Sequence, residues 1–205
     1  MFTPLVLALV AGYFLGSLPF GYLVARAKGV NIFEVGSKSS GATNVRRVLG
    51  NGPGALVLFL DALKGAAAAG WPLFVYSDEI GLSAGISALV GAVLGHSFSC
   101  FTKFKGGKSV ATGAGAFLVL FPIGAGIALA VFGITLAIGR VVSLSSMLAS
   151  IALPVTAWIL DRGTGLTVTC AAIAAFVIFR HRANISRILA GTENKIGNKN
   201  QSVQP

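Results

Sequence analysis

Lysines and a pair of glycines gather in the segment from Thr102 to Ser109, between two apolar stretches of the sequence. Cationic residues are costly beside lipid unless an anionic group needs them. Backbone N–H groups of Gly106 and Gly107, next to Lys105 and Lys108 at the start of a predicted helix, suit anionic oxygens. We therefore expect a phosphate-binding segment at one face of a membrane. The full nucleotide P-loop pattern is absent, so nucleotide hydrolysis is not expected.

A second polar segment covers residues 36–47 and combines glycines, hydroxyls, an amide and two arginines within twelve positions. Backbone N–H groups freed by glycine, together with a guanidinium fork, suit a phosphate dianion. The alternative is a basic membrane anchor that contains a serine-rich turn. The candidate binding residues are Gly36, Ser37, Thr43, Asn44 and Arg47.

A third polar segment, residues 180–187, follows the last apolar stretch. If it is helical, His181 and Asn184 lie three residues apart and share a face. A histidine and an amide at one site could orient and deprotonate a hydroxyl group. The alternative is a basic stripe that contacts lipid phosphates. The hydroxyls of Ser143 and Ser146 belong to a further polar turn, which we expect on the same side of the membrane.

The composition predicts an all-α integral membrane protein, because 55% of the residues are hydrophobic, 11% are charged and the mean hydropathy is +0.83. A helix needs roughly 17 to 25 mostly apolar residues to cross the hydrocarbon core. Seven candidate spans result, of which the fourth is short and ends in a predicted kinked hairpin at Phe121-Pro122. The spans are Pro4–Ala25, Gly54–Tyr76, Leu82–Phe98, Ser109–Phe121, Ile123–Gly139, Leu144–Leu160 and Thr164–Phe179.

Basic residues gather in alternate connections between these spans. The first, third and fifth connections and the C-terminal tail hold 14 of the 16 Lys and Arg residues. Cytoplasmic loops collect positive residues during insertion. We therefore predict seven transmembrane helices with the N-terminus outside and the C-terminus in the cytoplasm. Fusing the fourth and fifth spans into one kinked helix would leave six and would break the alternation.

Several classes of function are disfavoured by what lies between the spans. The basic residues stand in separate short loops with few interleaved aromatics, so no nucleic-acid surface is expected. The six acidic residues are dispersed, and neither Cys100 nor Cys170 lies in a His/Cys cluster, so we expect no metal, no cofactor and no disulfide. Residues 1–193 are predicted to form one transmembrane domain, and residues 194–205 a polar, disordered cytoplasmic tail.

Asp61 and Lys64 form a charge pair inside the second span. A transporter of phosphorylated or other organic anions could use such a pair for coupling, and this is the main alternative to an enzyme. A structural salt bridge is favoured, because no second inverted half with a matching broken segment is visible. His96, at the end of the third span, is predicted to cap or pack.

Ordered motifs extend over nearly the whole chain. They are Gly16-Ser17-Leu18-Pro19-Phe20-Gly21, Gly36-Ser37, Gly41-Ala42-Thr43-Asn44 with Arg47, Gly95-His96, Phe104-Lys105-Gly106-Gly107-Lys108, Val110-Ala111-Thr112, Val142-Ser143-Leu144 with Ser146, Arg180-His181-Arg182, Asn184-Ile185 and Glu193. In this arrangement the chain resembles the bacterial acyl-phosphate:glycerol-3-phosphate acyltransferases, the PlsY family. Four positions depart from the family pattern: Lys38 and Ser109 stand where glycine is usual, Ser39 where asparagine is usual, and Ser99 where proline is frequent.

The resemblance implies a seven-helix enzyme of the bacterial cytoplasmic membrane whose active site faces the cytoplasm. It would transfer a fatty acyl group from acyl phosphate to the 1-hydroxyl of sn-glycerol 3-phosphate, giving lysophosphatidic acid and phosphate. By motif position, Glu193 would be structural. The implied catalytic residues are Ser37, Arg47, Lys108, His181 and Asn184, and the implied substrate-binding residues are Gly36, Thr43, Asn44, Lys105, Gly106, Gly107, Ser143 and Ser146.

An acyl phosphate is a mixed anhydride with a good leaving group, so a site rich in cations can act by positioning and charge stabilisation without a covalent intermediate. The assignment of each phosphate to its cationic group is left open. The proton of the attacking hydroxyl has two candidate acceptors, His181 and a phosphate oxygen of the substrate.

Overall fold

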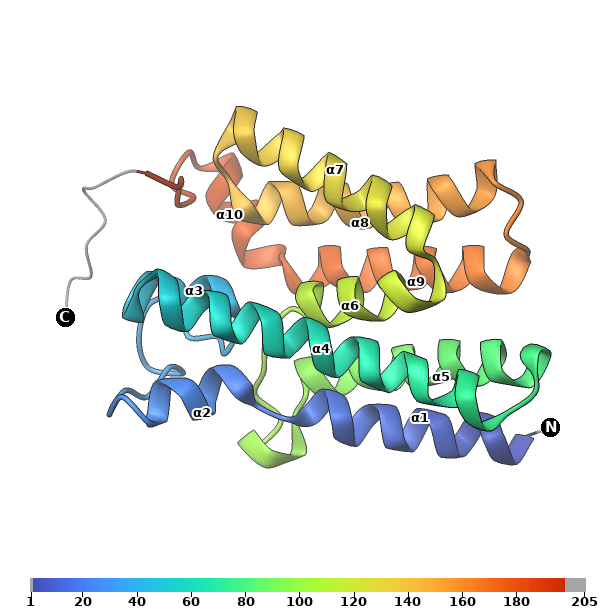
Figure 1. Ribbon diagram of the computed structural model, residues 1–205. Helices are drawn as coiled ribbons and strands as arrows, with labels where there is room; N and C mark the ends of the chain where they lie inside the picture. Colours follow the sequence, from blue (N-terminus) through green and yellow to red (C-terminus); the bar gives the residue numbers. More distant parts are fainter. Residues whose placement is uncertain (1, 198–205) are drawn as a thin grey trace. The chain divides into compact units, whose positions relative to one another are not determined.

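The computed structural model describes residues 2–197 and is helical throughout (Figure 1). Within these residues the regular structure consists of ten α-helices and one 3₁₀-helix. This confirms the predicted all-α class. The chain divides into two compact units, the first ending at Leu120 and the second beginning at Phe121.

Unit 1 is built on long helices that alternate in direction, with α1 and α5 running opposite to α4 (Figure 1). Small residues allow α1 and α5 to approach closely, because a Cβ atom added to Gly12 or Gly16 would overlap the backbone of α5. The elements of unit 1 are α1 (Phe2–Ser17), α2 (Phe20–Arg26), α3 (Ala42–Leu49), α4 (Asn51–Val75), α5 (Asp78–Ser97), η1 (Cys100–Thr102) and α6 (Val110–Leu120).

Unit 2 contains three long helices and a short one, and α8 packs against both α7 and α9. Pro122 begins α7 directly after the single non-helical residue Phe121, which fits the predicted break at this point. The elements of unit 2 are α7 (Pro122–Gly139), α8 (Val142–Ile159), α9 (Thr164–Arg180) and α10 (Arg182–Leu189).

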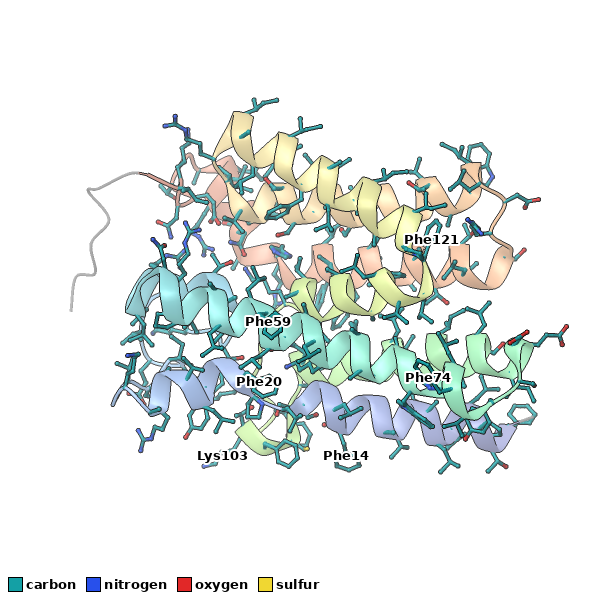
Figure 2. All side chains as sticks on the ribbon, in the orientation of Figure 1. Phe14, Phe20, Phe59, Phe74, Lys103 and Phe121 are labelled. Atoms are coloured by element: carbon teal, nitrogen blue, oxygen red, sulfur yellow. The ribbon has the colours of Figure 1, made fainter. Side chains whose placement is uncertain are left out.

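Large apolar side chains remain exposed along the helices. Phe14, Phe59 and Phe74, labelled in Figure 2, are 52%, 64% and 90% exposed. Within residues 2–197, five helical stretches are long and apolar enough to cross a membrane, and a sixth results if α9 and α10, bent by 59°, form one span. Lipid therefore covers surfaces that water would disfavour, and the protein is an integral membrane protein.

Each of the seven predicted spans contains a helix, but two of them differ in form from the prediction. The first is interrupted between α1 and α2, because Pro19 lacks an N–H and restricts the backbone of Leu18. The fourth corresponds to α6, whose 11 residues reach about 16 Å, roughly half the hydrocarbon thickness. The number of membrane crossings therefore stays a prediction.

The predicted C-terminal tail is described only in part. Ile196 N donates to the Arg140 carbonyl at 2.8 Å, so this part of the tail contacts unit 2. Residues 198–205 lie outside the described residues.

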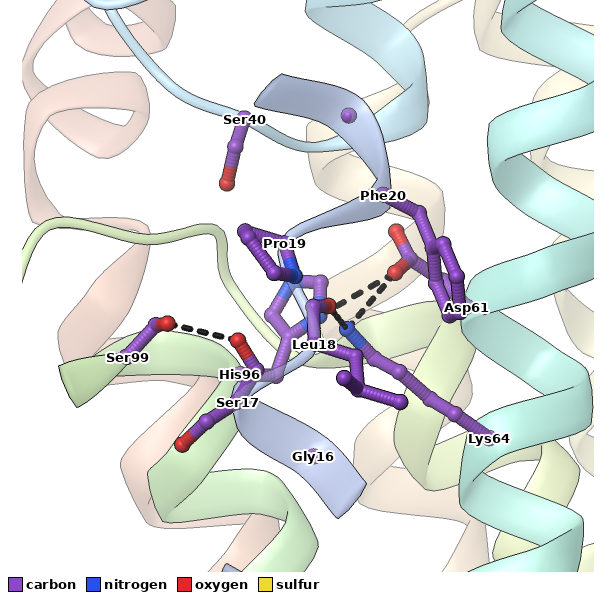
Figure 3. Close-up of a pocket in the computed structure, with 11 residues that line it drawn as sticks. Gly16, Ser17, Leu18, Pro19, Phe20, Ser40, Asp61, Lys64, His96 and Ser99 are labelled. Atoms are coloured by element: carbon purple, nitrogen blue, oxygen red, sulfur yellow. Dashed lines mark hydrogen bonds and ion pairs between the residues drawn. The ribbon is translucent and has the colours of Figure 1, made fainter. Parts of the chain in front are cut away.

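The predicted salt bridge inside α4 is present. Lys64 Nζ lies 2.8 Å from Asp61 Oδ1, and both side chains are at least 97% buried. Lys64 also donates to the Leu18 carbonyl at 2.7 Å, which satisfies a backbone group left open by the break between α1 and α2. In an apolar environment such groups need an internal partner. Lys64, paired with Asp61, thus supplies a hydrogen-bond donor to the backbone at the interruption of the first span (Figure 3).

Candidate functional site

Asn44, near the start of α3, shapes the loop that precedes this helix. Its Oδ1 accepts from Ser37 N at 2.8 Å, and its Nδ2 donates to the carbonyls of Ile32, Val35 and Ser39. Gly36 has a φ of +59°, and an added Cβ there would overlap the Asn44 amide. The side chain of Asn44 is therefore engaged by backbone, and its expected contact with substrate stays a prediction.

The loop and α3 present polar groups around this anchor. Ser37 and Thr43 are exposed and Arg47 is partly buried. On its other side α3 buries Val45 in an apolar cluster with Ala25 of α2 and other residues of unit 1. The buried face fixes the helix, so its hydroxyl and guanidinium groups stand on a rigid element.

The loop from Phe98 to Ser109 is held by side chains that are themselves buried. Ser109 has a φ of +62°, and its hydroxyl lies 2.7 Å from Ser97 Oγ and donates to the Val93 carbonyl at 2.6 Å. Ser99 Oγ donates to the Ser17 carbonyl at 2.5 Å. This loop is therefore a built structure that joins α5 to α6 through several hydrogen bonds.

The expectation that the N–H groups of both glycines in this loop face an anion is wrong for Gly107. Gly107 N donates to the His96 carbonyl at 3.1 Å, so this N–H is directed at the protein and not at an anion. Gly107 is buried, whereas Lys105 is exposed and Gly106 and Lys108 are partly buried. The cationic side chains remain candidates for phosphate binding. Gly107 has a structural role, because its N–H bonds the loop to the end of α5.

A small pocket in unit 1 lies at the break between α1 and α2, and residues 16–21 form much of its lining (Figure 3). Ser40 of the loop before α3, His96 at the end of α5 and Ser99 of the loop from Phe98 to Ser109 also line it. Asp61 and Lys64 of α4 contribute the remaining side chains. The structure thus brings the supports of the two loops of unit 1 to one place.

Unit 2 gathers the third polar segment around one carboxylate. Glu193 Oε1 accepts from Ser143 Oγ at 2.8 Å and from Asn184 Nδ2 at 2.5 Å, and Oε2 accepts from Arg187 Nε at 2.6 Å. The first turn of α8 and the helix α10 are therefore linked through Glu193. Ser146 lies one turn further along α8, where its hydroxyl donates to the Val142 carbonyl at 2.8 Å.

His181 is buried at the junction of α9 and α10. Its Nδ1 lies 2.8 Å from the Val177 carbonyl, which can only accept a hydrogen bond. Nδ1 therefore carries the proton of the neutral ring, and Nε2 has the lone pair. In this tautomer His181 can act as a base through Nε2.

The carboxyl group of Glu193 is kept ionised by its partners. Burial alone would raise its pKa, but hydrogen bonds from Asn184, Ser143 and Arg187, with the charge of Arg187, outweigh burial and lower the pKa below its ordinary value of 4.5. Sequence reasoning assigned Glu193 a structural role only through resemblance. Its acidity among basic residues was the one local signal.

Within residues 2–197, no group of three His, Cys, Asp or Glu side chains could hold a metal ion. Ser37 and Arg47 belong to one polar segment of unit 1 and Lys108 to the other. His181, at the junction of α9 and α10, and Asn184, on α10, belong to unit 2. Sequence reasoning missed the contact of His96 with the second loop, because it joins residues by tertiary packing.

Residues 6–191 match the family model described as glycerol-3-phosphate acyltransferase. The chain belongs to this family. It is 45% identical to a glycerol-3-phosphate acyltransferase of Synechococcus sp. (strain JA-3-3Ab), with 95% of this chain and 94% of the relative covered. A relative of the same name from Fusobacterium nucleatum is 44% identical, with 91% and 95% covered.

Two solved structures are also similar to this chain. Both are crystal structures of PlsY (YgiH), an integral membrane glycerol 3-phosphate acyltransferase. The glycerol 3-phosphate form is 36% identical with a TM-score of 0.88, covering 94% of this chain and 96% of that one. The lysophosphatidic acid form is 36% identical with a TM-score of 0.82, covering 94% and 95%.

Two non-glycine residues of the polar segments fall at strained backbone positions. Lys38 and Ser109 have φ values of +55° and +62°. A side chain in this region costs about 1–2 kcal/mol. The two hydrogen bonds of the Ser109 hydroxyl offset this cost, whereas nothing in the structure explains the choice of Lys38.

Replacing Glu193 with Gln should lower stability at neutral pH by about 1–3 kcal/mol, because charged hydrogen bonds to Arg187 and its neighbours are lost. The native pKa of Glu193 is depressed, so its contribution is complete above the ordinary pKa and fades as pH falls through the native pKa. Thermal unfolding in detergent should therefore separate E193Q from wild type at pH 7, and the two should converge in acid.

The matched control is Glu34→Gln, which removes an exposed carboxylate whose contact with Asn31 is local. It should change the unfolding midpoint little. A difference between E193Q and wild type that persists unchanged into acid would contradict the assignment.

Proposed function

We propose that this protein transfers a fatty acyl group from acyl phosphate to the 1-hydroxyl of sn-glycerol 3-phosphate, giving lysophosphatidic acid and inorganic phosphate, the first acylation of phospholipid synthesis. The observation that carries the proposal is the family match over residues 6–191. The solved relative was crystallised in a glycerol 3-phosphate form and a lysophosphatidic acid form, which correspond to the acceptor and product of this reaction.

The choice of acyl phosphate as donor is supported by the charge of the candidate residues. Two cationic segments of unit 1, residues 36–47 and 104–109, suit two phosphate groups, one on each reactant. In the reaction the 1-hydroxyl oxygen attacks the acyl carbonyl carbon, the bond from that carbon to the phosphate oxygen breaks, and phosphate leaves with the electron pair. Positioned cations stabilise the developing charge, so no cofactor or metal is required.

The roles of the residues follow from their chemistry. Arg47 and Ser37 would hold one phosphate, with Thr43 beside them, Gly36 allowing the turn and Asn44 fixing the loop. Lys108 would hold the other phosphate, with Lys105 and Gly106 of the same loop as further substrate contacts. Ser143 and Ser146 of unit 2 are the remaining proposed contacts.

His181 would accept the hydroxyl proton through Nε2, and Asn184 would orient the acceptor beside it. The tautomer set by the Val177 carbonyl supports this role. Glu193 would act indirectly, because it holds Asn184, Ser143 and Arg187 in place.

The proposed setting is the bacterial cytoplasmic membrane, with seven crossings, the N-terminus outside and the active site facing the cytoplasm. The concentration of Lys and Arg in alternate connections supports this orientation. A crossing at α6 would need the loop before it to cover part of the hydrocarbon thickness.

Purified protein in detergent should convert acyl phosphate and glycerol 3-phosphate to equal amounts of lysophosphatidic acid and phosphate. Lys108→Met should lower kcat/KM by roughly 100-fold, the loss expected when one charge-stabilising group is removed. The matched control is Lys103→Met, an exposed lysine of the same loop with no assigned role. An anion carrier would form no product, and this outcome would refute the proposal.

His181→Gln, assayed at saturating concentrations of both substrates, distinguishes the two proton acceptors. Loss of roughly 100-fold or more in kcat is expected for histidine base catalysis. Unchanged turnover would assign the proton to a phosphate oxygen of the substrate.

A further inference from the structure

His96 packs against the glycine pair of the loop from Phe98 to Ser109. It is 6% exposed at the C-terminal end of α5, and its carbonyl accepts from Gly107 N at 3.1 Å. A Cβ added to Gly107 would overlap His96 Nε2, and one added to Gly106 would overlap the His96 carbonyl. The imidazole ring and the backbone of His96 therefore lie directly against the glycine pair that precedes Lys108.

The ring of His96 is fixed from two other helices. Its Nδ1 lies 3.0 Å from Thr112 Oγ1 on α6 and 3.6 Å from Asp61 Oδ1 on α4. Gly65 allows α4 to approach α6 closely at this point, because an added Cβ would overlap the Thr112 carbonyl. Lys64 balances the charge of Asp61 at 2.8 Å.

These contacts form a continuous chain from α4 through the imidazole to the glycine pair. A buried charge pair and imidazole lose hydration, and apolar side chains of similar volume would fill the space at lower cost. The buried polar groups are therefore better explained by a need to hold the His96 ring in one orientation than by a need to fill space. This chain of contacts ends at the loop that carries Lys108.

We propose that His96 is a positioning residue for phosphate binding: Thr112 and the Asp61–Lys64 pair orient its ring, and the ring and carbonyl hold the Gly106-Gly107 turn so that Lys108 meets its phosphate in one geometry. This inference rests on the proposed function and deepens it. Preorganisation of this kind acts on the binding of one substrate, because a shift of about 1 Å at a binding group costs up to roughly 100-fold.

The test measures KM for acyl phosphate and KM for glycerol 3-phosphate in four single variants. His96→Leu removes the polar ring at similar volume, and Thr112→Val removes one of its anchors. Each should raise one KM, by roughly 10- to 100-fold for His96→Leu and less for Thr112→Val, and leave the other KM near wild type. The affected substrate should be the one whose KM rises in Lys108→Met. Thr156→Val, a buried threonine of α8, is the matched control and should change neither KM.

Combining His96→Leu with Lys108→Met supplies a readout that a general loss of structure would not give. If His96 acts through Lys108, the double variant should show no further rise in that KM beyond Lys108→Met alone. Additive rises, or equal rises for both substrates, would overturn the inference. If His96→Leu does not fold, Thr112→Val carries the test, and a wild-type KM for both substrates would overturn it.

Wild-type turnover is measured first, which separates the two proposals. Absence of lysophosphatidic acid from the wild-type reaction refutes the proposed function. Normal wild-type turnover with both KM values unchanged in His96→Leu and Thr112→Val refutes only the role of His96.

Discussion

The absence of water inside a membrane obliges every polar group there to find a partner within the protein. In unit 1 two side chains meet this requirement at the interruption between α1 and α2, where they bond to backbone carbonyls. Lys64 donates a hydrogen bond to the Leu18 carbonyl at the break between α1 and α2, and Ser99 donates one to the neighbouring Ser17 carbonyl. The same condition holds the loop before α6, where Gly107 donates to His96. Satisfying the backbone and shaping the site are thus one process.

The charges of the candidate residues follow a second rule, that carboxylates are kept from competing with anionic substrates. Asp61 is paired with Lys64, and Glu193 is surrounded by three donors that include Arg187. The cationic residues Arg47 and Lys108 belong to segments without an acidic residue. Such an arrangement favours binding of two phosphorylated reactants and direct transfer between them.

Sequence reasoning predicted the helices well, because long apolar runs in a membrane have one stable form. It also selected the three polar segments by residue type. It failed where tertiary contacts decide. The N–H of Gly107 was expected to face an anion and is bound to His96, and the Asn44 amide is engaged by backbone carbonyls from other parts of its loop. Neither contact has a periodic or local signature, and the hub at Glu193 joins residues from two connections.

In the proposed reaction both phosphorylated reactants are bound at once, and the acyl group passes directly between them. Initial rates measured while acyl phosphate and glycerol 3-phosphate are varied together test this order of events. Double-reciprocal plots should intersect, and mass spectrometry of the protein with acyl phosphate alone should detect no acylated residue. Parallel lines together with a stable acyl-protein adduct would show that the acyl group passes through a covalent intermediate and would overturn direct transfer.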